Sequence, residues 1–272
     1  MSPHIQHRQD QPILDVHHLT VKYDNRLALE EVTFHLHAGE RVAVVGPNGA
    51  GKSTLFKVIV GVKVPYSGNV QIFGSRPGGH VCIGYVPQHS QVDWSFPVTV
   101  ADVVMMGRVA QVGMLRWPRN SDRQRVRQAL EIVGLVDLAS RQIRQLSGGQ
   151  QQRMFIARAL AQEAELMLMD EPLTGLDTPS QEGLLGLLDT LQRQDVTVMV
   201  ATHDLDQAGR HFDRLMLLNR RLIGFGRPQD VLQAERLRRA YGGRLRLLED
   251  EQSVLALDDT CCDDGETHDH FS

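Results

Sequence analysis

Residues 46–53 of the chain read GPNGAGKS, and this stretch fits the pattern G-x-x-x-x-G-K-[ST] of a loop that holds phosphate groups. An apolar run, Arg41–Val45, precedes it, and a stretch with helical periodicity, Thr54–Val60, follows it. Glycines let backbone N–H groups curl around phosphate oxygens, and the start of the helix directs its positive dipole end at the anion. The order of strand, loop and helix therefore predicts a nucleotide-binding α/β domain. It argues against the alternative, an ordinary glycine-rich turn.

Two side chains of this loop have expected roles. Lys52 is placed to reach the β- and γ-phosphates, and the hydroxyl of Ser53 is placed to ligate Mg²⁺. The expected ATP-binding set comprises the whole loop and the residue after it: Gly46, Pro47, Asn48, Gly49, Ala50, Gly51, Lys52, Ser53 and Thr54. This motif alone leaves kinases, GTPases and ATPases as open alternatives.

Two further apolar runs end in side chains suited to phosphate chemistry. The run Leu166–Asp170 ends in a carboxylate, and ligands of parallel α/β sheets bind at the carboxyl ends of strands. Asp170 is therefore expected beside the phosphate loop, holding Mg²⁺ through water, with Glu171 as general base toward the attacking water. Helix capping is the structural alternative for this acidic pair. The run Val196–Thr202 ends at His203, which would lie within reach of the γ-phosphate.

The pattern of elements predicts an α/β fold with a mainly parallel sheet, an antiparallel β edge and an inserted helical subdomain. Residues 13–22 alternate between apolar and polar, which favours an exposed edge strand. Other expected strands are Val32–Leu36, Gly68–Ile72, Cys82–Val86 and two within 213–226. Expected helices are Val100–Arg108, one capped by Ser121 or Asp122 and stopped by Gly134, Pro179–Gln194 and Pro228–Tyr241.

Composition is that of an ordinary globular chain, with 42% hydrophobic residues among 272 and a net charge of −4. This excludes collagen-like and fully disordered chains. Nine acidic residues and no Lys or Arg follow position 248, so the preceding part carries +5, too little to indicate nucleic acid as a partner.

No apolar run approaches the roughly 18–20 residues that span a bilayer, and the first residues lack the apolar stretch of a signal peptide. A cytoplasmic location is therefore expected.

The stretch Leu146-Ser147-Gly148-Gly149-Gln150 decides among these nucleotide binders. It reads as a capped helix start whose N–H groups can face an anion. Lying between GPNGAGKST at 46–54 and LMLMDEP at 166–172, it resembles the signature of ATP-binding cassette (ABC) ATPases. Gln88, the stretch TGLD at 174–177 and His203 follow the family's order, and the resemblance spans residues 13–235. Thr174-Gly175 replaces the Ser-Ala of many members, with little loss expected because all four are small.

The resemblance implies a role for each matching position. Tyr23 would stack on adenine, and Gln88 would contact Mg²⁺ and couple to a membrane partner. Asp177 would cross a dimer interface, and His203 would act as the switch histidine. Four residues would contact ATP held by a second cassette: Ser147, Gly148, Gly149 and Gln150. The expected catalytic set is Glu171, His203 and Gln88, and the expected Mg²⁺ set is Ser53, Gln88 and Asp170.

The resemblance also implies partners. One cassette carries the phosphate loop and the signature on opposite edges, so two copies would pair head to tail in a homodimer. Residues 86–108 and the run at 218–226 resemble cassettes of bacterial manganese, zinc and ferrous-iron importers. This implies ATP-driven import of a divalent metal ion, manganese first, through a separate permease in the inner membrane, served by an extracytoplasmic metal-binding protein. The alternative is a soluble ABC ATPase without a transport role.

The expected domain organisation has three parts. Residues 1–11 would be a flexible leader, 12–235 the ATPase domain with a helical subdomain at about 88–145, and 236–272 a C-terminal helix with an acidic tail. The tail contains Cys261-Cys262 and His268-Asp269-His270, whose sulfur and imidazole groups could bind zinc or manganese. Their spacing fits no standard zinc template, so an unstructured tail is the favoured interpretation.

Overall fold

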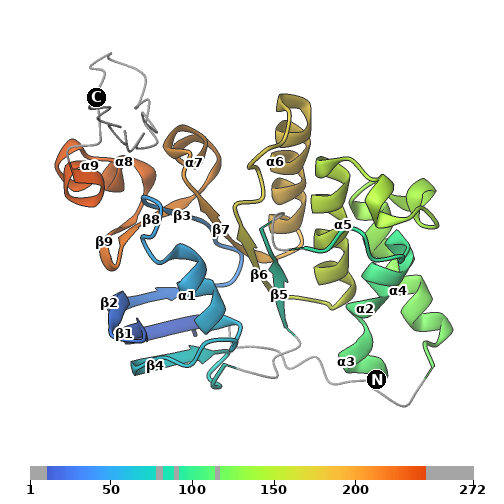
Figure 1. Cartoon of the computed structure of the whole chain (residues 1–272), viewed down its shortest axis with the longest axis horizontal. Coiled ribbons are helices and arrows are strands. Elements are labelled where there is room, and N and C mark those ends of the chain that lie inside the picture. The colour runs from blue at the N-terminus through green and yellow to red at the C-terminus, as the bar shows by residue number, and fades with distance from the viewer. Residues whose placement is uncertain (1–10, 78–81, 89–91, 114–116, 243–272) are drawn as a thin grey trace, which may run out of the picture.

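The computed structural model describes residues 11–77, 82–88, 92–113 and 117–242, and two sheets form its frame (Figure 1). The larger sheet contains, in spatial order, β5 (Ile83–Val86), β6 (Leu166–Asp170), β7 (Thr197–Thr202), β3 (Arg41–Val45), β8 (Arg214–Asn219) and β9 (Arg221–Gly226). All neighbouring strands are parallel except β8 and β9, which are antiparallel. The predicted mainly parallel sheet with an antiparallel edge is therefore confirmed.

The smaller sheet is antiparallel and has the order β2-β1-β4. Its strands are β1 (Leu14–Tyr23), β2 (Arg26–Leu36) and β4 (Ser67–Ile72). The prediction of an edge strand over residues 13–22 is wrong, because β1 pairs with both neighbours. The alternation of apolar and polar residues along β1 arises because one face of an antiparallel sheet is buried while the other meets solvent. This holds for a central strand as well as for an edge strand. β2 also begins earlier than predicted, since Tyr23 already pairs with Arg26.

Two hydrophobic clusters cover the two faces of the larger sheet. Val42 and Val44 of β3 belong to the cluster that contains residues of α1 (Lys52–Ile59) and of the smaller sheet. Ala43 and Val45 belong to the cluster that contains residues of α5 (Gly148–Ala161) and α6 (Thr178–Gln192). Successive side chains of a strand point to opposite faces, so a strand buried on both faces must be apolar throughout. This explains the continuous apolar runs from which the strands are predicted.

Nine α-helices occur in the described part of the chain. They are α1 (Lys52–Ile59), α2 (Val100–Met106), α3 (Val109–Val112), α4 (Asn120–Ile132), α5 (Gly148–Ala161), α6 (Thr178–Gln192), α7 (Leu205–His211), α8 (Pro228–Val231) and α9 (Ala234–Tyr241). Helices α2 to α5 gather at one end of the molecule, away from the smaller sheet (Figure 1). Within the described residues, none of the helices combines the length and the apolar character needed to cross a membrane.

Two helix predictions need correction. Helix α4 begins at Asn120 rather than after Ser121 or Asp122, and the Asp122 carboxylate instead accepts the N–H of Arg119 at 2.9 Å from within the first turn. The single helix expected over 228–241 is two helices, α8 and α9. In one continuous helix Val231 and Ala240 would lie on opposite faces, and the break lets both be buried.

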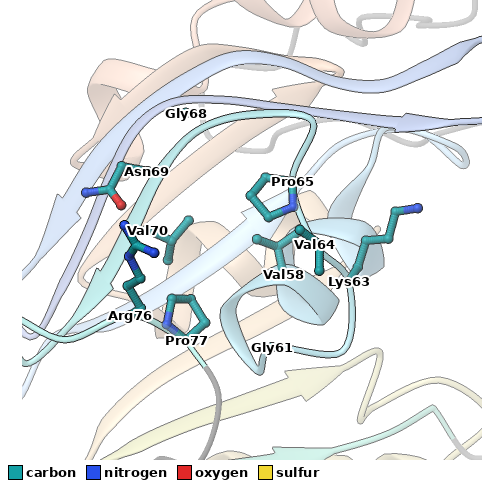
Figure 2. Close-up of a pocket in the computed structure, with 10 residues that line it drawn as sticks. All are labelled: Val58, Gly61, Lys63, Val64, Pro65, Gly68, Asn69, Val70, Arg76 and Pro77. Carbon is teal, nitrogen blue, oxygen red and sulfur yellow. The ribbon is translucent and has the colours of Figure 1, made fainter.

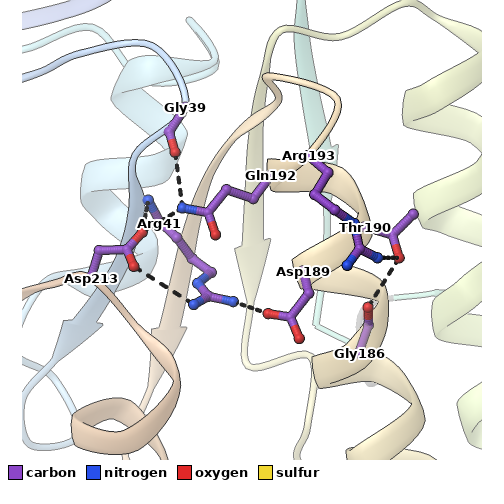
Figure 3. Close-up of polar contacts among 8 residues, drawn as sticks. All are labelled: Gly39, Arg41, Gly186, Asp189, Thr190, Gln192, Arg193 and Asp213. Carbon is purple, nitrogen blue, oxygen red and sulfur yellow. Dashed lines mark hydrogen bonds and ion pairs between the residues drawn. The ribbon is translucent and has the colours of Figure 1, made fainter.

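Polar contacts fasten the amino end of β3 to its neighbours (Figure 3). Arg41 forms ion pairs with Asp189 of α6 and with Asp213, which precedes β8, the latter at 3.7 Å. Gln192 donates to Asp213 at 2.7 Å and to the Gly39 carbonyl at 3.3 Å. These contacts join β3, α6 and the start of β8 at the edge of the sheet opposite the carboxyl ends of the strands.

Candidate functional site

The strand register places the candidate residues at one edge of the sheet. Val45, the last residue of β3, pairs with Thr202, and Asp170, the last residue of β6, pairs with Ala201. Since β7 lies between β3 and β6, these three carboxyl ends are level. The loop of residues 46–51 therefore begins beside the strands that end at Asp170 and at residue 202, as the motif order predicts.

The phosphate loop is tightly packed around a buried lysine. Lys52 is 6% exposed, and its Nζ donates to the Gly46 carbonyl at 2.7 Å and to the Pro47 carbonyl at 3.3 Å. Gly51 has φ +98°, and a Cβ there would lie 2.6 Å from the Ala28 carbonyl oxygen, so only glycine fits. Burial lowers the pKa of Lys52, while the charges of Glu171 and Asp170 oppose this effect. The cation thus lies among its own loop carbonyls and next to carboxylates.

Asp170 has a buried carboxylate with unused bonding capacity. The residue is 1% exposed, and its Oδ2 has no hydrogen-bond partner among the described residues. Burial is the largest cause that raises its pKa, and a hydrogen bond with Ser53 of α1 acts in the opposite direction. A buried carboxylate oxygen without a donor is costly, and hard cations prefer oxygen ligands of this kind. The pair Ser53 and Asp170 therefore fits a magnesium ion.

Glu171 and His203 meet at the ends of β6 and β7. Glu171 has φ +48°, a strained backbone for a residue with a side chain, and its N–H donates to the Ala201 carbonyl at 3.0 Å. Its Oε2 lies 3.8 Å from Nδ1 of His203 and accepts a hydrogen bond from Thr174 at 3.3 Å. The carboxylate of Glu171 therefore lies beside His203 and Thr174, whereas that of Asp170 is buried beside Ser53.

The signature stretch forms a self-contained helix start. Ser147 is the N-cap of α5, where its Oγ accepts from the Gln150 N–H at 3.3 Å and its own N–H donates to Gln150 Oε1 at 3.0 Å. A Cβ on Gly149 would lie 2.8 Å from Ser180 Oγ at the start of α6. Strands β5 and β6 lie between α1 and α5 (Figure 1). The structure thus brings Lys52 and Asp170 together but leaves Ser147 apart from them.

The remaining predicted residues lie around this edge. Gln88 lies two residues after the end of β5 and is half-buried, and Asp177 is the exposed N-cap residue of α6. Tyr23 is 42% exposed, and Lys63 Nζ lies 4.3 Å from the centroid of its ring. The predicted roles of these three residues rest on their positions in the motif pattern, and they stay predictions.

For the aromatic residues Trp94 and Phe96, the sequence predicts either packing within the helical lobe or contact with a membrane partner. Trp94 packs edge to face on Phe155 of α5, with ring centroids 5.7 Å apart, so its half-buried ring belongs to the lobe. Phe96 is 56% exposed. Packing within the lobe therefore accounts for Trp94 and leaves Phe96 available to a partner.

Tyr85 is a polar group at this site that the sequence analysis missed. It lies on β5, and burial raises its pKa to about 12, with a smaller contribution from the charge of Asp170. Because Tyr85 lies in the apolar run Cys82–Val86, sequence patterning alone predicts a core residue there. The available signal is the alternation along the strand, which points Tyr85 to the same face of the sheet as α1.

A pocket of about 380 Å³ lies between α1 and β4 and is separate from this edge (Figure 2). Its walls include Val58, Gly61, Pro65 and Val70. These residues lie at the carboxyl end of α1 and beyond it, whereas the phosphate loop is at the amino end. The pocket is therefore not part of the phosphate site.

Comparison with known proteins matches the described geometry to one family. The family model described as "ABC transporter" matches residues 29–174, more than half of the chain. The chain belongs to this ABC transporter family. Its phosphate loop, signature and carboxylate-ended strand form the ATP-binding cassette of that family, and the chain is an ATPase of this type.

Relatives of known name cover most of the cassette. The chain is 43% identical over 244 residues to the manganese transport system ATP-binding protein MntB of Bacillus subtilis, covering 89% of this chain and 97% of that protein. It is 44% identical over 234 residues to the zinc transport system ATP-binding protein TroB of Treponema pallidum, covering 85% of this chain and 88% of that protein. Among solved structures, cbiO1 from Clostridium perfringens, part of the ABC transporter complex cbiONQ, has a TM-score of 0.72 at 30% identity and covers 85% of this chain and 94% of that one.

Among the described residues, no group of three or more His, Cys, Asp or Glu side chains is arranged to hold a metal ion. The pairs Cys261-Cys262 and His268-Asp269-His270 lie outside the described residues. So do most of the predicted leader and the acidic tail, and the predicted domain boundaries at 11/12 and 235/236 stay predictions. The remaining cysteine, Cys82, is half-buried, and its pKa is raised to about 11 by burial and by the charge of Glu165, which makes it an unreactive thiol.

Proposed function

We propose that this chain powers the import of a divalent transition metal ion, manganese before zinc or iron, through separate permease subunits in the inner membrane. The observation that carries this proposal is the near full-length similarity to a cassette named for manganese transport, with a zinc-transport cassette at similar identity. The chain would bind the cytoplasmic face of the permease, and an extracytoplasmic metal-binding protein would deliver the ion. The transported ion is cargo and would touch no residue of this chain.

The phosphate loop supports ATP binding by residues of one copy. The N–H groups of residues 46–54 would surround the phosphates, and Tyr23 would stack on adenine. Lys52 is held by the loop carbonyls of Gly46 and Pro47, and this fixed position supports a role for its ammonium group toward the phosphates. This preorganisation reduces the loss of side-chain freedom on binding.

Magnesium would be held by Ser53, Asp170 and Gln88. The unpartnered buried oxygen of Asp170 and the neighbouring hydroxyl of Ser53 support this assignment. When bound, the ion would neutralise negative charge that develops on the phosphate groups.

Hydrolysis would use Glu171 as the general base. Its carboxylate takes one proton from water while the water oxygen forms a bond to the γ-phosphorus. The bond between this phosphorus and the β–γ bridging oxygen breaks, its electrons stay on ADP, and inorganic phosphate is released. His203 lies 3.8 Å from Glu171 and would contact the γ-phosphate from the neighbouring strand end.

A second copy would complete the site. The signature residues lie on α5, across β5 and β6 from α1, so they would reach the γ-phosphate of ATP bound by the partner (Figure 1). Head-to-tail pairing about a two-fold axis supplies two such composite sites. ATP would favour the closed pair, and hydrolysis would let it open, which shifts the population of states seen by the permease.

The test is metal uptake in host cells that lack this gene. Labelled Mn²⁺, Zn²⁺ and Fe²⁺ uptake is measured before and after return of the native chain or of Glu171→Gln. The proposal predicts that Mn²⁺ uptake falls in the deletion and that only the native chain restores it. Uptake of all three ions at the wild-type rate in the deletion would contradict metal import.

A further inference from the structure

Tyr85 and Asp170 share one face of the larger sheet. In the parallel pair β5–β6, Tyr85 is opposite Leu168, two residues before Asp170. Because side chains of a strand alternate between faces, Leu168 and Asp170 lie on the same side as Tyr85. Tyr85 packs against the hydrophobic cluster of that side, which contains Leu168 and the residues of α1. The phenol is therefore on the side from which Ser53 contacts Asp170.

Each of these two side chains carries a buried oxygen that no well-aligned hydrogen bond satisfies. Among the described residues, neither the Tyr85 hydroxyl nor Asp170 Oδ2 makes a hydrogen bond of good geometry, while a weak hydrogen bond to Asp170 is one of the smaller causes that raise the pKa of Tyr85. Buried polar groups in folded proteins almost always have a partner, and two such atoms on one face of adjacent strands are complementary, since a phenol donates and a carboxylate accepts. A phenol is protonated at neutral pH and can therefore act as the donor.

We propose that Tyr85 is a positioning residue whose hydroxyl donates to the carboxylate of Asp170 and holds it in the orientation that faces magnesium. This inference rests on the proposed function in one respect, the role of Asp170 toward magnesium. Tyr85 also stands three residues before Gln88 on the same segment. Strand β5 therefore links the orientation of the Asp170 carboxylate to the position of Gln88. Movement of the segment that contains Gln88 would change the hydrogen bond from Tyr85 to Asp170.

The chain offers a matched control for the loss of a buried phenol. Tyr241 of α9 is buried, and its hydroxyl, like that of the half-buried Tyr85, is itself buried and lacks a well-aligned hydrogen bond in the part of the chain that the structure describes. It packs in the cluster on the opposite face of the sheet from Tyr85. A general effect of removing a phenolic oxygen from the core would therefore follow from Tyr241→Phe as well as from Tyr85→Phe.

The test compares ATP affinity with and without magnesium. Equilibrium dialysis with labelled ATP, in excess Mg²⁺ and in EDTA, measures the gain in affinity due to the metal, using full-length protein in the Glu171→Gln background to prevent turnover. Tyr85→Phe is expected to reduce this gain about three- to tenfold, which is the effect of losing one hydrogen bond. The ATP affinity in EDTA is expected to stay unchanged. Tyr241→Phe is expected to leave both affinities unchanged.

Two outcomes separate the inference from the function on which it rests. If Asp170→Asn leaves the magnesium-dependent gain intact, the assignment of Asp170 to magnesium is wrong and the inference falls with it. If Asp170→Asn removes the gain but Tyr85→Phe matches Tyr241→Phe, the role of Tyr85 alone is overturned. Should Tyr85→Phe not fold, Tyr85→Met, which fills an apolar space without a hydroxyl, is measured in the same way.

Discussion

The phosphate loop and the signature stretch both begin a helix and both can offer backbone N–H groups to an anion, yet their surroundings differ. At the loop, Lys52 is buried and Asp170 keeps an unpartnered oxygen. At the signature, Ser147 is exposed and bonds reciprocally with Gln150. Beside the loop, a buried carboxylate oxygen is left to bind a ligand. At the signature, Ser147 and Gln150 satisfy each other and stabilise the start of the helix. This contrast supports the proposal that one copy binds nucleotide through the loop and that the signature acts on nucleotide bound by another copy.

The two stretches also differ in what they do to stability. A reciprocal cap such as that of Ser147 and Gln150 stabilises a helix, typically by about 1 kcal/mol. The buried carboxylate of Asp170, with its raised pKa, has the opposite effect on the chain without ligand. The cap of the signature therefore stabilises the chain, whereas the buried carboxylate beside the phosphate loop destabilises the chain without ligand.

The largest expected effect comes from Glu171→Gln, which tests whether chemistry belongs to the loop side. Glutamine keeps the shape of the side chain but cannot accept the proton, so ATPase turnover should fall by about 10²- to 10⁴-fold. ATP affinity should remain close to that of the native chain. Steady-state phosphate release and equilibrium dialysis measure the two quantities. Normal hydrolysis by this variant would show that another group is the base.

Lys52→Ala tests whether the loop alone sets nucleotide affinity. Loss of one charge-assisted contact with phosphate should weaken ATP binding about 10- to 100-fold. Equilibrium dialysis on the isolated chain measures it, and a thermal melt confirms that the variant is folded. Native affinity in a folded Lys52→Ala protein would place the phosphates elsewhere.

Ser147→Ala separates the capping role of the signature from its role toward a partner. Thr99 caps α2 with the same reciprocal arrangement, through Asp102, and is the matched control. Both Ser147→Ala and Thr99→Ala should lower the free energy of unfolding by about 1 kcal/mol. ATPase turnover should fall in Ser147→Ala alone, while ATP affinity of the single chain stays unchanged in both. Equal turnover in the two variants would reduce the signature to a helix cap.

The smallest expected effect is a gain in stability from Asp170→Asn. Because burial raises the pKa of Asp170, the folded state is penalised at pH above that pKa, and the penalty disappears as pH falls below the ordinary value of 3.8. The variant should be more stable by about 1 kcal/mol at neutral pH and lose this gain in acid. Urea unfolding at several pH values, without nucleotide, measures it. A loss of stability at neutral pH would show that the carboxylate is well compensated.

The parts of the site that follow from strand order could be predicted from sequence. The loop, Asp170, Glu171 and His203 each stand directly after an apolar strand, and parallel strands bring such ends together. The position of β1 could not be predicted, because alternation reports burial of a face and not the number of neighbouring strands. The break between α8 and α9 has no Gly or Pro to mark it and depends on packing of Val231.

Tyr85 shows a different limit of sequence reasoning. Its role follows from the register of β5 against β6, which brings it level with Leu168. No local pattern contains that pairing, and a tyrosine in an apolar run is most simply a core residue. The separation of the signature from the loop is likewise a property of how α5 packs, and the linear order of the motifs does not show it.

The most direct test of the shared site is the mass of the Glu171→Gln protein by light scattering after size exclusion, with Mg²⁺ and ATP. The account predicts about twice the 30.5 kDa of one chain with ATP, and a single chain with ADP. Adding Ser147→Arg, at an exposed position, should keep the protein a monomer that still binds ATP. A monomer in the first case, or a dimer that persists with Ser147→Arg, would contradict a nucleotide site shared between two copies.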